Sequence, residues 1–475
     1  MKSRFPIAAY VAENRLSIKF SGVKHIKMGQ ITIRLPRQVQ WIIQKLKEQG
    51  FEAYAVGGCV RDSILGREPE DWDITTSAKP EEIKEIFRRT VDTGIAHGTV
   101  TVLAEKEGFE VTTYRIDGEY EDGRHPKEVW FTGMLAEDLK RRDFTINAMA
   151  YNDEDGLCDL FGGQEDLKQG VIRCVGEARE RFTEDALRIL RAVRFGAQLG
   201  FSMEEKTKEA AGALAGTLKK ISAERIQNEL VKLLVSPHPE ELLTAWELGI
   251  TKVILPEFDR MMETTQETPH HMYNVGVHTV EALKHIRADR ILRLTMLFHD
   301  MGKPEYKTMD PDGTAHFKKH AIGSERITKE ILRRLKFDND TVRSVTRLVY
   351  YHDYRMPPDK RSVRRAVNRI GKELFPYYLE IRMADTLAQS AYRREEKIAD
   401  IRGVEQCFYK ILRDGECVSL KEMAVTGKDL IGAGIKPGPQ MGEILNTLLE
   451  EVLEDPKKNQ KAYLLERALN VYEEK

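Results

Sequence analysis

The chain has 475 residues, 41% of them hydrophobic and 32% charged, which excludes collagen-like, low-complexity and mostly disordered proteins. Its 75 basic residues face 76 acidic ones, so a uniformly basic surface for nucleic acid is excluded, while a local basic patch is not. No apolar run approaches the roughly 18 residues of a membrane-spanning helix, so neither such a helix nor a membrane partner is expected.

The chain begins with a basic segment. Residues 1–28 hold six Lys or Arg and only one acid, Glu13, with a short apolar run from Phe5 to Ala12. Two interpretations stay open, a weak targeting segment and, favoured, a basic extension. We therefore assign residues 1–40 to a basic N-terminal extension.

Short β-rich runs then alternate with turns and helices as far as about residue 175. The expected elements are strands at 51–58 and 71–76, a helix from Pro80, a hairpin of 98–104 and 109–115 around the turn Glu105–Gly108, a flexible loop at 117–128 and a last strand at 171–176.

After residue 177, apolar residues at spacings of three and four predict amphipathic helices instead. The expected stretches are helices at 177–200, 222–236 and 241–250, a section end at Pro256, a His-rich helical region at 270–390, a helical tail from about residue 400 and a Gly/Pro turn between two helices in 427–454. The sequence thus predicts an α+β fold, a small α/β head followed by an all-helical body.

A Gly pair marks the first candidate site. Gly57 and Gly58 end a predicted strand just before a helix, so their unshielded backbone N–H groups suit a triphosphate. Arg61 adds a cation one turn later. A Gly pair before a helix is weak evidence alone, and the acidic residues that follow strengthen it.

Those residues are Asp71 and Asp73, two positions apart on a predicted strand, so both carboxylates share one face. Converging carboxylates repel unless a cation lies between them, and Mg²⁺ prefers such oxygen ligands together with substrate phosphates. Glu110, on a neighbouring strand, could supply a third oxygen. A solvated acidic loop would explain the two aspartates alone, but the Gly pair upstream favours a metal site.

The stretch 57–76 resembles the nucleotidyltransferase superfamily, specifically the bacterial class II CCA-adding tRNA nucleotidyltransferase/poly(A) polymerase family. The motifs that agree with it, in order, are RRDFTINAMAY (141–151), DLFGG (159–163), EDALRILRAVRF (184–195) and SAERIQNEL (222–230). The resemblance implies two-metal phosphoryl transfer without a covalent nucleophile, with Mg²⁺ held by Asp71 and Asp73 and Glu110 as a third catalytic carboxylate. The implied nucleotide contacts are Gly58, Arg61, Arg142, Asp185, Arg188, Arg191 and Arg194.

The spacing of the last four also suggests how bases are chosen. Asp185, Arg188, Arg191 and Arg194 are three residues apart and would form a polar stripe along one helix. Cytosine and adenine both present an amine beside a bare ring nitrogen, which a carboxylate and a guanidinium match. Guanine and uracil present the opposite polarity. A surface helix with solvated arginines is the alternative.

Histidines and aspartates form a second candidate site. His278, the pair His299–Asp300 and Asp385 lie on or at the ends of predicted helices and resemble the HD-domain metal phosphohydrolases. The resemblance implies a divalent transition metal on these four residues and activity on phosphorylated RNA ends. His320 and His352 are candidates for a second ion. The alternative is a helical scaffold without metal.

The sequence also carries a basic stretch at 354–370, whose charge fits either phosphate contact or a solvated helix face. The predicted domains are the basic extension (1–40), a nucleotidyltransferase head (41–176), a helical neck and body with base reader and RNA binding (177–260), an HD domain (261–395) and a helical C-terminal tail that binds tRNA (396–475).

The expected function is CCA addition to tRNA 3′ ends from CTP and ATP without a nucleic-acid template. A partial specialist that adds only CC, only A or poly(A) shares every motif. A non-catalytic RNA-binding protein is the remaining alternative, and the intact acidic residues argue against it. Five cysteines without CxxC spacing favour a reducing cytoplasm.

Overall fold

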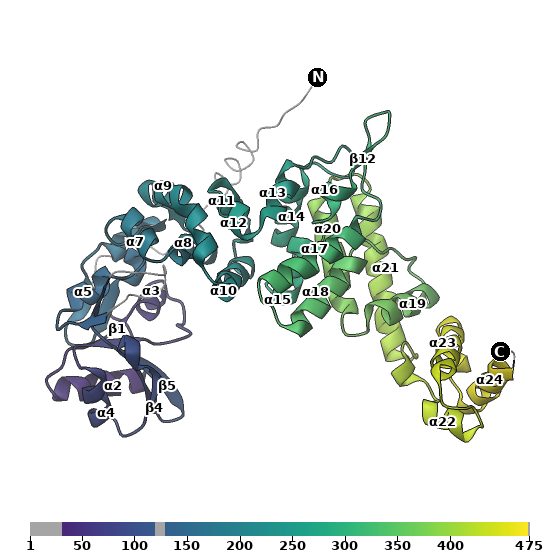
Figure 1. Ribbon diagram of the computed structural model, residues 1–475, viewed down its shortest axis with the longest axis horizontal. Helices are drawn as coiled ribbons and strands as arrows, with labels where there is room; N and C mark the ends of the chain where they lie inside the picture. Colours follow the sequence, from purple (N-terminus) through teal and green to yellow (C-terminus); the bar gives the residue numbers. More distant parts are fainter. Residues whose placement is uncertain (1–30, 119–128, 474–475) are drawn as a thin grey trace. The chain divides into compact units, whose positions relative to one another are not determined.

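The computed structural model describes residues 31–118 and 129–473 (Figure 1). The first 30 residues of the predicted extension and most of the predicted loop at 117–128 lie outside the described residues. The chain divides into two compact units, Met1–Ile254 and Leu255–Lys475. None of the helices in the described part combines the length and apolar character needed to span a bilayer.

Strands organise the first unit. They are β1 (Ala53–Val56), β2 (Ile74–Thr76), β3 (Thr90–Gly94), β4 (Thr99–Ala104), β5 (Glu107–Thr113), β6 (Arg115–Asp117), β7 (Val129–Phe131), β8 (Met149–Asn152), β9 (Gly156–Asp159), β10 (Val171–Ile172) and β11 (Ser202–Met203). Seven form one sheet in the order β3-β4-β5-β2-β1-β8-β9, in which β2 and β5 pair in parallel. The pairs β6–β7 and β10–β11 stand outside this sheet.

The predicted hairpin is confirmed, because β4 and β5 pair antiparallel with Ala104 opposite Glu107. Its turn is tighter than predicted and contains Glu105 in a left-handed conformation (φ 57°). Every second residue of β4 is buried, Val100 and Val102 among them, as the alternating sequence requires. The helix from Pro80 is also confirmed, as α4 (Pro80–Ile86).

Two strand predictions need correction. The second strand begins at Ile74, so Asp71 and Asp73 lie in the segment before it and strand alternation does not set their direction. Only Val171–Ile172 of the predicted last strand is extended, and it pairs in parallel with β11 rather than joining the sheet. The short strands β3, β8 and β9 were not predicted, since four or five residues carry too little periodicity.

The helices of the first unit, besides α4, are α2 (Arg37–Glu48), α3 (Gly58–Ile64), α5 (Leu135–Lys140), α6 (Gly163–Gln169), α7 (Ala178–Glu184), α8 (Leu187–Leu199), α9 (Glu205–Leu214), α10 (Ala223–Leu234), α11 (Leu242–Glu247) and α12 (Thr251–Ile254), with 3-10 turns η1 (Ile95–His97), η2 (Thr145–Asn147), η3 (Ala215–Lys220) and η4 (Pro239–Glu241).

The predicted continuous helix at 177–200 is wrong. Asp185 is extended (φ −139°, ψ 103°) and separates α7 from α8. Its carboxylate accepts a hydrogen bond from the backbone N–H of Leu187 at 3.0 Å. This local bond competes with helical hydrogen bonding, which explains the break in a sequence that is otherwise helical.

The second unit is almost entirely helical. Its elements are α13 (Pro256–Glu263), α14 (Val275–Lys284), α15 (Arg290–Phe298), α16 (Lys303–Tyr306), α17 (His320–Arg334), α18 (Asn339–Tyr351), α19 (Lys360–Ile370), α20 (Phe375–Ala388), α21 (Arg394–Arg413), α22 (Gly427–Gly432), α23 (Pro439–Glu454) and α24 (Lys461–Glu473), the strands β12 (Thr308–Met309) and β13 (Ala315–His316), and the turns η5 (Leu420–Glu422) and η6 (Pro456–Lys458). The predicted section end at Pro256 is confirmed to within two residues, since the first unit ends at Ile254. Pro256 itself begins α13, because proline fits the first helical position.

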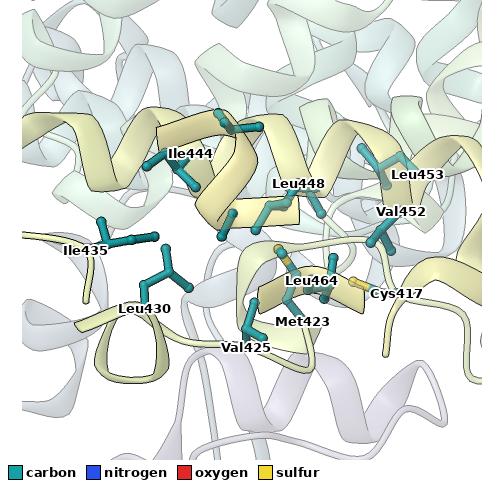
Figure 2. Close-up of a cluster of buried hydrophobic side chains, with 13 residues drawn as sticks. Cys417, Met423, Val425, Leu430, Ile435, Ile444, Leu448, Val452, Leu453 and Leu464 are labelled. Carbon is teal, nitrogen blue, oxygen red and sulfur yellow. The ribbon is translucent and has the colours of Figure 1, made fainter. Parts of the chain in front are cut away.

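The end of the chain has its own apolar core (Figure 2). Leu430 on α22, Ile444 and Leu448 on α23 and Leu464 on α24 are fully buried there. The Gly/Pro turn predicted between two helices is confirmed, since it joins α22 to α23.

Residues 360–370 of the basic stretch form α19, and four of its cations face carboxylates of the chain's own end. Arg364 is buried, binds Glu416 at 2.6 Å and donates to two carbonyl oxygens at the end of α23. The other pairs are Lys360 with Asp414 and Glu416, Arg361 with Glu454, and Arg365 with Glu450 and Glu454. These charges hold α19 to α23 and the residues before it. Phosphate contact by the exposed cations of the stretch stays a prediction.

Candidate active site

The Gly57–Gly58 turn lies between β1 and α3, where the sequence places it. Gly57 has φ +86°, and a Cβ there would lie 2.9 Å from Nη1 of Arg142, so only glycine fits. Arg61 on α3 donates to Oδ1 of Asn147 at 2.7 Å and pairs with Asp62. The fold therefore brings Gly58, Arg61 and Arg142 together at the end of β1.

Three carboxylates lie near this turn. Burial raises the pKa of Asp73, Glu110 and Asp71 raise it further by repulsion, and the Arg142 guanidinium opposes them. Asp73 is thus within electrostatic reach of both acids and of the cation. Among the described residues, these carboxylates do not form a group with ligand atoms within 4.8 Å of one another. The predicted shared strand face is absent because the aspartates precede β2.

The arginines predicted to contact nucleotide on α8 all bind acidic residues. Arg188 is buried and donates to Glu184 at 2.6 Å. The further pairs are Arg191 with Asp143 at 2.6 Å, and Arg194 with Glu229 at 2.8 Å. Arg194 also stacks on the Phe195 ring, 3.6 Å from its centroid.

Asp185 is not part of a continuous stripe with these arginines, since it precedes α8. Its carboxylate accepts two hydrogen bonds from Arg225 on α10, at 2.6 and 3.3 Å. Asp185 and Arg188 remain near one another, because the N–H of Arg188 donates to the carbonyl of Asp185 at 3.0 Å. Both side chains are currently bound to other protein groups.

Sequence reasoning missed the acids that join the motifs. Asp143 binds Arg191, and Glu229 binds Arg194 and lies 3.7 Å from Arg191. The two carboxylates thereby connect RRDFTINAMAY, EDALRILRAVRF and SAERIQNEL into one buried network. Each acid lies inside a motif that the sequence analysis had singled out, so its importance could have been predicted. The arginine that each acid binds could not.

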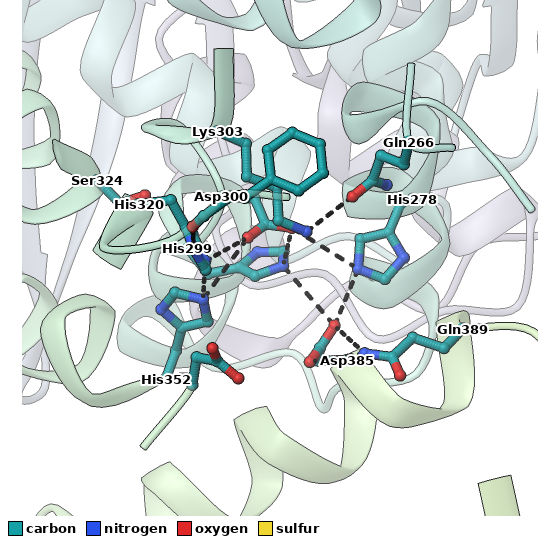
Figure 3. A network of polar contacts seen from close by, with 12 residues as sticks. Gln266, His278, His299, Asp300, Lys303, His320, Ser324, His352, Asp385 and Gln389 are labelled. Carbon is teal, nitrogen blue, oxygen red and sulfur yellow. Dashed lines mark hydrogen bonds and ion pairs between the residues drawn. The ribbon is translucent and has the colours of Figure 1, made fainter. Parts of the chain in front are cut away.

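A second polar cluster lies in the helical unit (Figure 3). His278 on α14 contacts Asp385 on α20 at 2.9 Å, and His299 follows the last turn of α15. Nε2 of His299 lies 3.1 Å from Asp300 and 4.0 Å from Asp385. The four residues predicted as one site therefore meet in space, with three of them almost completely buried.

Asp300 belongs to two groups of candidate metal ligands. His278, His299 and Asp300 form one group, and Asp300, His320 and His352 form the other, each with ligand atoms within 4.8 Å. Oδ1 of Asp300 lies 3.3 Å from His320 and 3.6 Å from His352. His316 lies apart on β13 and pairs with Asp310.

Gly302 allows this arrangement, because α17 passes directly over it. A Cβ at this position would lie 2.4 Å from the carbonyl oxygen of His320 and 2.5 Å from the N–H of Ser324. The close backbone approach brings His320 to the side of Asp300 that His299 does not contact.

The charges in the cluster are uneven. Burial alone would raise the pKa of Asp300, but His299 and Lys303 hold it well below its usual value. Nζ of Lys303 lies 2.7 Å from Asp300 and donates to Gln266. His271, which was not predicted, has its pKa lowered to about 2 by burial and by Lys303 and His278, so it is neutral.

Three protein-family profiles match successive parts of the chain. A protein-family profile described as "Poly A polymerase head domain" matches residues 53–173. Profiles described as "Probable RNA and SrmB- binding site of polymerase A" and "tRNA nucleotidyltransferase domain 2" match residues 200–262 and 319–468.

Whole-length relatives also exist. A CCA-adding enzyme of Lactiplantibacillus plantarum is 34% identical over 94% of this chain and 99% of its own length. One of Lactococcus lactis subsp. cremoris is 38% identical over 90% and 94%. The crystal structure of the Bacillus stearothermophilus CCA-adding enzyme in complex with CTP superimposes with a TM-score of 0.65 and 29% identity, covering 92% of this chain and 98% of that one.

Proposed function

Since the chain belongs to the CCA-adding enzyme family, we propose that it adds CCA to tRNA 3′ ends from CTP and ATP, without a nucleic-acid template. The observation that carries this proposal is geometric. The N–H of Val56 donates to the carbonyl of Asp73 at 3.0 Å beside the Gly57–Gly58 turn, and the parallel pair Ile74–Val111 places Glu110 on the strand next to Asp73, with Arg142 at Gly57. Transfer from a triphosphate needs both features, acids that hold cations and positive groups that hold phosphates.

The carboxylates fit a divalent ion in kind, because carboxylate oxygens are the donors that Mg²⁺ prefers, and Asp73 precedes a strand that pairs with the strand of Glu110. Asp71 and Asp73 are the proposed Mg²⁺ ligands and Glu110 the third catalytic carboxylate. Bound Mg²⁺ would lower the pKa of the primer 3′-OH and neutralise charge on the triphosphate. Gly58, Arg61 and Arg142 would hold the phosphates as the primer oxygen attacks the α-phosphate and pyrophosphate leaves.

Asp185 and Arg188 remain the proposed base reader. The carboxylate would accept from the exocyclic amine of C or A, and the guanidinium would donate to the neighbouring ring nitrogen. To do so, Asp185 must release Arg225 and Arg188 must release Glu184 before they bind the base. Arg191 and Arg194 are already paired with Asp143 and Glu229, so their proposed role is to hold α8, which carries Arg188, in position.

A second function is favoured by a specific observation, the orphaned Nε2 of buried His299. This atom makes no hydrogen bond in the described structure, although it lies among the oxygens of Asp300 and Asp385. A nitrogen in this position fits a metal ligand. We propose that His278, His299, Asp300 and Asp385 hold a divalent transition metal in an HD domain at 261–395, and that His320 and His352 hold a second ion with Asp300.

A metal there would supply Lewis-acid activation of water for phosphohydrolase activity on RNA ends. Burial of the histidines keeps competing water away, and Lys303 balances the charge of Asp300.

The other predicted domain bounds, 41–176 for the head, 177–260 for the neck and body and 396–475 for the tail, stay proposals, as does the cytoplasmic location.

One experiment separates the proposed function from a partial specialist. Purified protein is incubated with tRNA that lacks its 3′ end and with CTP, ATP, UTP or GTP singly and together, and the added nucleotides are sequenced. CC from CTP alone and CCA from CTP with ATP are expected. Addition that stops at CC, or starts only on tRNA ending in CC, would make the chain a CC-adding or A-adding enzyme.

A further inference from the structure

Lys397 on α21 lies beside the His/Asp cluster and is linked to it by one amide. Its Nζ donates to Oε1 of Gln389 at 2.6 Å, and Nε2 of Gln389 donates to Asp385 at 3.1 and 3.2 Å. Asp385 in turn contacts His278 (Figure 3 shows Gln389, Asp385 and His278). A single side chain therefore separates this ammonium group from the proposed metal ligands.

The ammonium group lacks a carboxylate partner of its own. Among the ion pairs of the described residues, none involves Lys397, and its second contact is Nδ1 of His270 at 3.1 Å. A half-buried lysine whose neighbours are an amide and an imidazole is poorly neutralised. The charge of such an ammonium group is stabilised when an anion binds beside it.

Further cations lie near it. The guanidinium of Arg394 donates to the carbonyl oxygen of Gln389, whose side chain accepts from Lys397. Burial lowers the pKa of Lys397, and repulsion from Arg355, Arg382 and Arg393 lowers it further, with Asp385 opposing them. The pKa of His270 is lowered by burial and by Lys397, Arg355 and Arg393. Like charges that repel one another mark a place where an anion would be attracted.

The partners of these arginines leave them available. Arg355 makes a long, exposed pair with Asp353 at 3.3 Å, and Arg382 donates to the carbonyl oxygen of Tyr354. Arg393 pairs with Glu396, and both are exposed. Exposed pairs of this kind contribute little energy and exchange readily for another anion.

An aromatic ring adds a second kind of contact. Tyr392 is half exposed, and its ring lies against the His270 ring at a centroid distance of 4.9 Å. Exposed aromatic rings beside cations are typical of sites where a nucleobase stacks while its phosphate is held. This favours a nucleotide over inorganic phosphate.

We infer that Lys397, with Arg355 and Arg382, is the phosphate-binding rim of the His/Asp cluster and receives the terminal phosphate of an RNA 3′ end, with Tyr392 against its base. The inference deepens the proposed phosphohydrolase function and rests on it for the later reaction. Binding itself requires no metal, so it can be measured separately.

The test uses the full-length protein in EDTA and a short fluorescent oligoribonucleotide with either a 3′-phosphate or a 3′-OH, measured by anisotropy. Wild-type protein should prefer the 3′-phosphate by at least about tenfold, since a charge-assisted hydrogen bond is lost with the hydroxyl. Lys397→Met should abolish the preference, and Lys397→Arg should restore part of it. Lys410→Met, an exposed lysine on the same helix, should change nothing.

Equal wild-type affinity for the two ends would overturn the inference without any variant. Inorganic phosphate that competes at the oligonucleotide's own concentration would overturn the assignment to RNA. Selective binding without phosphate release by metal-loaded protein would leave the rim standing and reject the hydrolytic function. If metal-loaded Lys397→Met released phosphate with an unchanged KM, the hydrolytic function would stand and the phosphate-binding role of Lys397 would be rejected.

Discussion

Arg191 on α8 donates two hydrogen bonds to one oxygen of Asp143, from Nε at 2.9 Å and from Nη2 at 2.6 Å. Because Asp143 follows Arg142 in the chain, this contact fixes the helix that carries the proposed base reader to the segment beside the Gly pair. Asp143 also accepts from Asn147 and from the N–H of Phe144. Its carboxylate is therefore fully engaged inside the protein.

Removing that carboxylate should destabilise the first unit. Asp143→Asn removes the charged partner of Arg191, whose side chain is 32% exposed and keeps Glu229 at 3.7 Å, so we expect a loss of about 1–3 kcal/mol. Urea unfolding followed by circular dichroism measures the loss. Asp92→Asn, which breaks an exposed pair with Lys84, should cost less than about 1 kcal/mol. Equal losses in the two variants would show that the pair is not a structural link.

The same carboxylate predicts a dependence on pH. Burial alone would raise the pKa of Asp143, but Arg191 and the hydrogen bond from Asn147 lower it well below its usual value. A lowered folded-state pKa gives stability that is present above the unfolded pKa, about 3.9, and is lost as pH falls further. The difference between wild type and Asp143→Asn should therefore shrink between pH 5 and pH 3, as urea unfolding across that range would show. A constant difference would contradict this.

Asp71→Asn or Asp73→Asn should abolish addition of both C and A. Each change removes a charge that the proposed Mg²⁺ needs, and a loss of about 3 kcal/mol already slows transfer more than 100-fold. Incorporation of labelled CMP and AMP into tRNA lacking its end gives the rates, and filter binding checks that tRNA affinity is nearly unchanged. Glu107→Gln, on the same strand as Glu110, is the matched control. A variant that kept one of the two additions at the wild-type rate would refute a single shared site.

Changes in the base reader should alter selectivity more than rate. Asp185→Ala removes the acceptor for the amine of C and A, so UTP and GTP should compete about tenfold better. Arg188→Ala should act in the same direction. Sequencing of products made with mixed nucleotides measures misincorporation, and Arg225→Gln controls for loss of the Asp185 ion pair alone. Unchanged fidelity with a uniformly raised KM would make these residues packing or phosphate contacts.

The His/Asp cluster should be separable from nucleotide addition. His299→Ala together with Asp300→Ala removes two proposed ligands, so metal content should fall by far more than the roughly 10–100-fold caused by losing a supporting partner. Elemental analysis after metal loading measures this, beside assays on 2′,3′-cyclic phosphate ends. CCA addition to an intact 3′-OH should persist within a few-fold. Wild-type protein that takes up no metal would reduce the cluster to a scaffold.

Sequence patterns located the elements with strong periodicity and the residues with unusual chemistry. The β4–β5 hairpin and the helices carrying His278 and Asp385 were predictable because alternation and helical spacing extend over many residues. The break at Asp185 was not, since it depends on one side-chain hydrogen bond. Periodicity cannot register so local an effect.

Pairing between distant residues was equally hidden. The charges of α19 are visible in the sequence, but their neutralisation by Glu416 and Glu454 joins positions about 50 to 90 apart. Likewise, nothing adjacent to Arg194 indicates that Glu229 will bind it. The charged residues that matter could therefore be identified in the sequence, but which residues they bind became known only from the fold.

The position of His320 beside Asp300 depends on a single residue, Gly302. Any larger residue there must push the α17 backbone away from Asp300, which would separate His320 from the carboxylate while sparing His278 and His299. A substitution at Gly302 would therefore separate the two groups of candidate metal ligands without changing any of these ligands. The residue to follow among relatives is the glycine, whose missing side chain sets the distance between the groups.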